Sequence, residues 1–215
     1  MANAYALTVV NKSQLQRPRF AVFASMPVKA NYESVSLAWF VQEIDATNQY
    51  TFRWGLEWAF VWSAEGTDAT AGVAWQATGS RAADPDSAST SAVAFEYDGG
   101  DFTFRTAEPP QGLSPDGSTL WILDEPRVPT PSVKPSSVGV SLEGRPVCVL
   151  EAGPNLRQTF TLHPTYYIDA GNYVPGQMVD GADLTAFQKL EYAHGVTALT
   201  ATLNPDNTWT VAPTA

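Results

Sequence analysis

The chain has 215 residues and a formal net charge of −10, because 22 acidic side chains outnumber 12 basic ones. Such a surface repels phosphate backbones and anionic lipids, so we expect neither nucleic acids nor acidic membranes as partners. An apolar content of 44% and seven tryptophans are typical of a globular protein. A chain of this length buries a core without disulfide bonds.

The N-terminus and the cysteine content bear on the compartment. Residues 1–7 lack the basic start and long apolar run of a signal peptide, and no stretch approaches the ~18 apolar residues that span a bilayer. The single cysteine, Cys148, has no partner for an internal disulfide. We therefore expect no membrane span, and a protein that is cytoplasmic or exported without a cleavable N-terminal signal.

Alternating apolar residues predict strands along the first part of the chain. Short β-rich runs occupy 5–10, 20–24 and 35–44. The strongest signal covers 50–63, where every even position is large and apolar: Tyr50, Phe52, Trp54, Leu56, Trp58, Phe60 and Trp62. Period-two alternation predicts a strand with one buried face. A strand of this length is longer than most, so we expect a bend or bulge at Gly55. The sequence leaves open whether the tryptophan row is core or the wall of a cavity.

Turn sequences divide the rest of the chain. The small, polar segment 79–91 predicts a surface loop. Hairpins are predicted around Asp98-Gly99-Gly100-Asp101 and around Asn204-Pro205-Asp206-Asn207. Residues 182–192 are the one stretch compatible with a short helix. Residues 109–136 contain seven prolines, which mark either a domain linker or a crossover between sheets. We favour the crossover, because neither half carries enough strands for its own sandwich.

These elements predict an all-β fold. We expect an antiparallel β-sandwich of about ten to twelve strands, with a long Pro-rich crossover loop and residues 1–215 forming a single domain.

Residues that commonly carry catalysis are scarce. The two histidines, His163 and His194, lie at predicted turns, and no G-x-S-x-G motif places a serine beside either. Cys148 lies between two valines in a predicted strand, which favours a buried structural thiol. No ligand spacing for zinc or calcium and no Gly-rich phosphate loop is present, so we expect no metal and no cofactor. The sequence favours a binding protein over an enzyme.

Aromatic residues near predicted loops are the remaining candidates for ligand binding. Consecutive tyrosines in a strand face opposite ways, so one of Tyr166 and Tyr167 should be exposed or line a cleft. The candidate ligand-binding residues are His163, Tyr166, Tyr167, Asn172, Tyr173 and Trp121.

Four stretches resemble the RhiA family, bacterial proteins named for expression in the rhizosphere. They are Ser36 to Phe40, Phe52 to Gly66, Thr161 to Ile168 and Thr200 to Val211. The resemblance runs from the first strands to the last, which implies one unit over nearly the whole chain. It brings no reaction, ligand or catalytic residue that can be transferred to this sequence.

Three functional hypotheses follow. The first is a non-enzymatic binding or interaction protein of bacterial origin, whose unidentified ligand is a carbohydrate or a small apolar molecule. The second is a cofactor-free enzyme with an aromatic-lined cavity for a small molecule. The third is a self-associating structural protein, a homo-oligomer formed through free strand edges.

Overall fold

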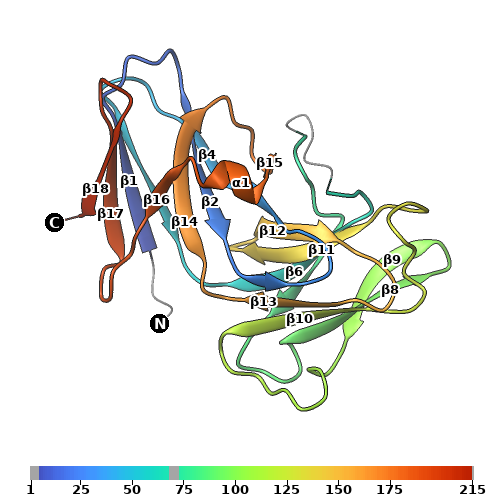
Figure 1. Cartoon of the computed structure of the whole chain (residues 1–215). Helices are drawn as coiled ribbons and strands as arrows, with labels where there is room; N and C mark the ends of the chain where they lie inside the picture. The colour runs from blue at the N-terminus through green and yellow to red at the C-terminus, as the bar shows by residue number, and fades with distance from the viewer. Residues whose placement is uncertain (1–4, 68–72, 215) are drawn as a thin grey trace.

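The protein is described here from a computed structural model that covers residues 5–67 and 73–214 (Figure 1). These residues form eighteen strands and one four-residue helix. The elements are β1 (Tyr5–Asn11), β2 (Arg19–Ser25), β3 (Val28–Lys29), β4 (Val35–Glu43), β5 (Gln49–Trp54), β6 (Trp58–Ser63), β7 (Gly79–Ala83), β8 (Ala92–Asp98), β9 (Asp101–Thr106), β10 (Thr119–Asp124), β11 (Ser137–Leu142), β12 (Arg145–Glu151), β13 (Arg157–Thr161), β14 (Thr165–Gly171), β15 (Met178–Val179), α1 (Gly181–Leu184), β16 (Gln188–Leu190), β17 (Ala198–Leu203) and β18 (Trp209–Pro213). Among the described residues, no helix is long and apolar enough to cross a membrane.

The strands form three sheets. The central sheet has nine strands in the order β16-β14-β2-β4-β12-β11-β6-β7, with β15 paired to β4. A four-stranded sheet has the order β18-β17-β1-β5, and a five-stranded sheet the order β3-β13-β10-β8-β9. Pairing is antiparallel except between β1 and β17 and between β8 and β10. Figure 1 shows the four-stranded sheet beside the β14–β2 end of the central sheet and the five-stranded sheet beside its β11–β6 end.

One contiguous core lies between the central sheet and both smaller sheets. It contains Leu7 from β1, Phe60 from β6, Ile122 from β10 and Ile168 from β14, all fully buried. Two smaller apolar clusters cover the opposite face of the central sheet, one around Trp75 and one around Leu184 of α1. The predicted all-β sandwich is therefore confirmed, with more strands than the ten to twelve expected.

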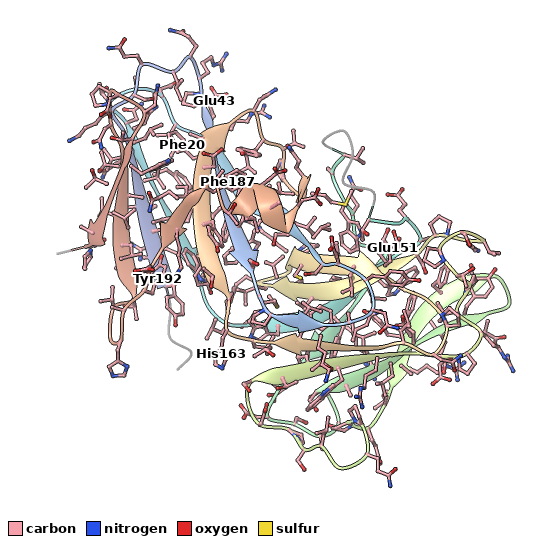
Figure 2. The ribbon with its side chains drawn as sticks, viewed as in Figure 1. Phe20, Glu43, Glu151, His163, Phe187 and Tyr192 are labelled. Atoms are coloured by element: carbon pink, nitrogen blue, oxygen red, sulfur yellow. The ribbon has the colours of Figure 1, made fainter. Side chains whose placement is uncertain are left out.

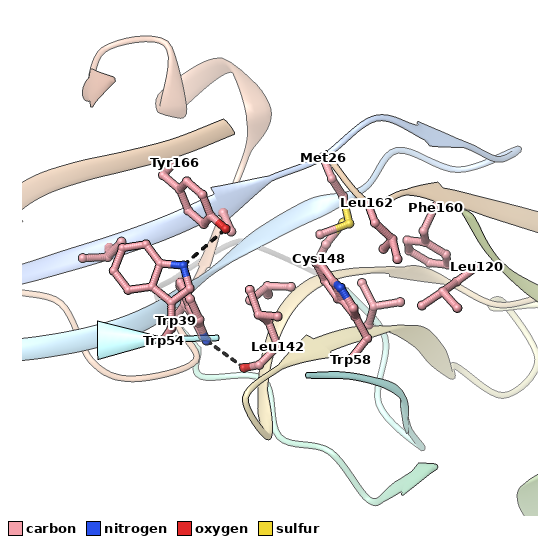
Figure 3. Close-up of a cluster of buried hydrophobic side chains, with 14 of the residues drawn as sticks. Met26, Trp39, Trp54, Trp58, Leu120, Leu142, Cys148, Phe160, Leu162 and Tyr166 are labelled. Carbon is pink, nitrogen blue, oxygen red and sulfur yellow. Dashed lines mark hydrogen bonds between the residues drawn. The ribbon is translucent and has the colours of Figure 1, made fainter. Parts of the chain in front are cut away.

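The long alternating run does not form one bent strand. It ends at Trp54 in the four-stranded sheet and starts again at Trp58 in the central sheet. The break is stabilised by Glu143 in the β11–β12 turn, whose Oε1 accepts a hydrogen bond from the Gly55 N–H at 3.0 Å. Trp54 and Trp58 are only 3% and 8% exposed, so these tryptophans are core residues (Figure 3).

Other expectations for local structure had mixed outcomes. Both predicted hairpins are confirmed, as β8–β9 and β17–β18. The Pro-rich segment carries β10 of the five-stranded sheet and then leads to β11 of the central sheet, as expected of a crossover. The predicted loop 79–91 was wrong in part, because residues 79–83 form β7 along the edge of β6. The predicted helix shrinks to α1, and β16 follows it.

Candidate ligand-binding hollow

The central sheet opens into a fork between β4 and β12. These two strands pair only where Val35 and Ser36 meet Val149 and Cys148. Beyond that point β4 follows β2 and β12 follows β11, so the strands diverge. Pro146 has no N–H to contribute to a ladder at this place.

A β-bulge on the other edge of β4 accentuates the divergence. Val22 of β2 pairs with Phe40 while Phe23 pairs with Ala38, which leaves Trp39 as the extra residue of the bulge. The Trp39 indole donates a hydrogen bond from Nε1 to the carbonyl oxygen of Leu142 at 3.0 Å (Figure 3). This bond fixes the indole at the base of the fork.

Two distant segments border the fork on the side of β4. The Gly176 N–H donates to the Ala38 carbonyl oxygen, and the Ala38 N–H donates to the Gln177 carbonyl oxygen, both at 2.9 Å. The Trp75 N–H in turn donates to the Gly176 carbonyl oxygen at 2.8 Å. Gly176 has a φ of +78°, and a Cβ there would lie 2.7 Å from the Trp75 carbonyl oxygen. Glycine is therefore required where these two segments meet.

The fork contains an open hollow of about 420 Å³. Its lining residues are Ala38, Trp39, Val41, Trp75, Gln76, Ala77, Arg145, Pro146, Pro175 and Gly176. The volume falls in the range of small-molecule sites, ~300–1,000 Å³, and such sites are mostly apolar with a few polar groups. The hollow has this character, because most of its described lining is apolar and its polar side chains there, the two indoles apart, are Gln76 and Arg145.

Arg145 is the one charged residue that the described part of the chain contributes to the lining. Its guanidinium carbon lies 4.5 Å from the centroid of the Phe40 ring, a cation–π contact. Among the described residues the guanidinium forms no ion pair. The carboxylate nearest in sequence, Glu143, is occupied by the N–H groups of Gly55 and Glu57, at 3.0 and 3.4 Å.

The residues predicted to bind a ligand lie in separate places, none of them in the lining of this hollow. Tyr166 is 5% exposed and accepts a hydrogen bond from Trp54 Nε1 at 3.3 Å (Figure 3). Burial raises the pKa of Tyr166 to about 12. His163 is exposed at the connection between β13 and β14 and is labelled in Figure 2. Trp121 is buried in β10 of the five-stranded sheet.

Tyr167 and Tyr173 lie on the face of the central sheet that α1 covers. Both pack, partly buried, against the cluster around Phe23 and Leu184. The Tyr173 hydroxyl donates to Asp169 Oδ2 at 2.6 Å. Burial, reinforced by this carboxylate, raises the pKa of Tyr173 above its ordinary value. Asn172 is exposed beside them, so only Tyr167, Asn172 and Tyr173 share one neighbourhood.

Sequence reasoning did not find the hollow. Trp39 lies in the predicted strand 35–44, and neither Trp75 nor Arg145 was among the candidate ligand-binding residues. Their approach depends on the contact between the Trp75 and Gly176 segments, which are far apart in sequence. The proline directly after Arg145, inside a strand, is the one local signal of an interrupted ladder.

A buried polar cluster lies elsewhere, between the five-stranded and central sheets. Asp124 is 4% exposed and Gln158 is fully buried. Asp124 Oδ2 accepts hydrogen bonds from the Gly153 N–H at 3.0 Å and from Gln158 Nε2 at 2.8 Å. Burial raises the pKa of Asp124 to about 8, against these two bonds. Among the residues that the structure describes, no three His, Cys, Asp or Glu side chains gather as metal ligands.

The fold and the hollow define a class: an all-β protein with three sheets around a shared core and a lateral, largely apolar hollow. The model of the RhiA family matches residues 2–214. Protein RhiA of Rhizobium leguminosarum bv. viciae is 33% identical over 213 residues, which are 97% of this chain and 86% of that protein. The chain belongs to the RhiA family. No solved structure matches it.

Proposed function

We propose that this protein is a non-enzymatic binding protein and that the hollow between β4 and β12 takes a small molecule with an apolar body. The observation that carries the proposal is the hollow itself, of about 420 Å³ with walls of Trp39, Trp75 and Val41. Aromatic and aliphatic walls of this kind recognise ligands through burial of apolar surface.

The chemistry of the lining favours binding over catalysis. General acid–base and nucleophilic steps depend on His, Asp, Glu, Lys, Cys, Ser, Thr or Tyr within reach of the reacting group. Among the described residues, none of these types lines the hollow. The alternative of an enzymatic cavity beside the tryptophan row has less support, since Trp54 and Trp58 are packed in the core.

The same features support the proposal that residues 1–215 act as one domain. The main core cluster draws side chains from all three sheets. Phe60 of β6 packs against Phe104 of β9 with ring centroids 6.1 Å apart, and Phe20 of β2 against Trp209 of β18 at 6.0 Å.

A ligand screen with a filled-hollow variant tests the proposed function. Ala77 lines the hollow and is exposed, so Ala77→Phe should fill the hollow without disturbing the core. Ligand-observed NMR with a library of small aromatic, aliphatic and sugar compounds at about 1 mM would detect weak binders. We expect apolar-bodied binders that lose their signal with Ala77→Phe and are recovered chemically unchanged.

Ala82→Phe is the matched control, because Ala82 is also exposed but lies on β7 and outside the lining. It should bind like the wild type. The proposal would be contradicted if no compound bound, or if the compounds that bind gave the same binding signal with Ala77→Phe as with the wild type. Chemical conversion of a bound compound would favour the enzymatic alternative.

A further inference from the structure

The hollow joins an apolar wall to a single cation, and this pairing indicates the ligand class. We propose that the hollow selects an organic carboxylate with a flat apolar body, and that Arg145 binds the carboxylate group. The inference rests on the proposed function and deepens it.

The charge of Arg145 has no acid to neutralise it in the described part of the chain. The four ion pairs there use Arg17, Arg105, Arg127 and Lys189. Among residues 5–67 and 73–214, no other charged side chain lines the hollow. A guanidinium carries five N–H donors in one plane and suits the two oxygens of a carboxylate. Within the described lining, an anion entering the hollow would therefore meet the Arg145 guanidinium and no competing carboxylate.

The contact with Phe40 prepares Arg145 for this role. Phe40 is only partly buried, and its ring lies under the guanidinium at 4.5 Å from centroid to Cζ. A guanidinium placed over a ring loses less rotamer freedom when it binds a ligand. The apolar body would then lie against Trp39, Trp75 and Val41, which line the same hollow.

The net charge of the whole protein acts in the opposite direction. A total of −10 repels anions at long range. At ~0.15 M ionic strength, charges beyond about 8 Å are largely screened. At this ionic strength Arg145 therefore dominates the electrostatic potential in the hollow. Far below it, the net negative charge is less screened, so we expect the affinity for a carboxylate to fall.

Calorimetry with two matched probes tests the inference on the full chain. The probes are 2-naphthoate and its neutral isostere 2-naphthamide. We expect 2-naphthoate to bind the wild type about tenfold more tightly or better, as charge-assisted hydrogen bonds allow. Arg145→Gln should weaken 2-naphthoate by about ten- to hundredfold and leave 2-naphthamide within about twofold.

Arg53→Gln is the matched control. Arg53 is exposed, as Arg145 is, but it belongs to β5 and lies outside the lining. It should leave both affinities unchanged. Equal affinity for the two probes, no binding of 2-naphthoate, or an unchanged affinity in Arg145→Gln would overturn the inference. In each case the proposed function is judged separately, by whether Ala77→Phe abolishes the binding of other library compounds.

Discussion

Replacing Gly139 by alanine is expected to lower the free energy of unfolding by about 3 kcal/mol or more. Gly139 lies in β11, which is paired on both sides, to β12 and to β6. A Cβ at this position would overlap the backbone oxygen of Cys148 and lie 2.8 Å from the Cα of Val149. Both obstacles are backbone atoms of a buried neighbouring strand, so no side-chain rotation relieves the clash. The urea midpoint, followed by tryptophan fluorescence, measures the loss.

Gly181→Ala is the matched control for this substitution. A Cβ at Gly181 meets nothing within 4 Å, and the backbone there does not have a positive φ. The control should unfold within about 0.5 kcal/mol of the wild type. A midpoint for Gly139→Ala equal to that of the control would show that β11 and β12 lie farther apart than described.

Alternation predicted most of the buried face, but it did not predict the division of the run between two sheets. Phe52, Trp54, Trp58 and Phe60 are buried as the even-position pattern predicted, whereas Tyr50 and Leu56 are exposed. The break at 55–57 has three residues, so Trp54 and Trp58 are four positions apart and both fall on even positions of the pattern. A period-two pattern is therefore the same for one long strand and for two strands in different sheets.

Strand β7 shows the limit of composition as a guide. Its residues, Gly-Ser-Arg-Ala-Ala, have low strand propensity and were predicted as loop. A Cβ at Gly79 would overlap the Trp62 indole, so a small residue is needed for this edge to approach β6. Arg81 adds a hydrogen bond to the Phe104 carbonyl oxygen at 3.4 Å. Contacts with β6 and β9 thus determine that residues 79–83 form a strand, and the local sequence does not reveal these contacts.

The hollow could not be predicted from the sequence for a related reason. The predicted ligand-binding residues lie near predicted loops, and all except Trp121 fall between His163 and Tyr173. Adjacent strand residues point to opposite faces, and Tyr166 indeed lies in the main core while Tyr167 packs on the other side. The hollow instead combines side chains from segments as far apart as Trp39 and Pro175.

Replacing Asp124 by asparagine is expected to remove much of the pH dependence of stability between pH 5 and 8. The carboxyl of Asp124 is buried, its Oδ1 has no hydrogen-bond partner, and neither has Gln158 Oε1. Burial raises the pKa of Asp124 from 3.8 to about 8, so the folded protein holds it protonated at pH 7. A protonated Asp124 also carries one O–H donor, whereas the ionised carboxylate and Gln158 Oε1 are both acceptors.

The sign of the effect follows from proton linkage. Because the folded pKa lies above the unfolded value, the stabilisation from this proton is fully present below about pH 4. It is lost as the pH rises through about 8. The asparagine amide imitates the protonated acid at every pH, since its Nδ2 can donate where the acid hydroxyl would. The variant should therefore gain stability relative to the wild type as pH rises from 5 to 8, by on the order of 3 kcal/mol.

Urea unfolding of the wild type and Asp124→Asn at pH 5 and pH 8 measures this difference. Asp206→Asn is the control, because Asp206 is exposed and its hydrogen bonds to Thr208 lower its pKa. Asp206 is ionised in both the folded and the unfolded state across this range, so the control should differ from the wild type by the same amount at both pH values. If Asp124→Asn also showed a constant difference, Asp124 would be ionised in the folded protein. Its buried charge would then have to be neutralised by a cation bound beside Gln158, because a buried carboxylate without a partner is too costly to persist.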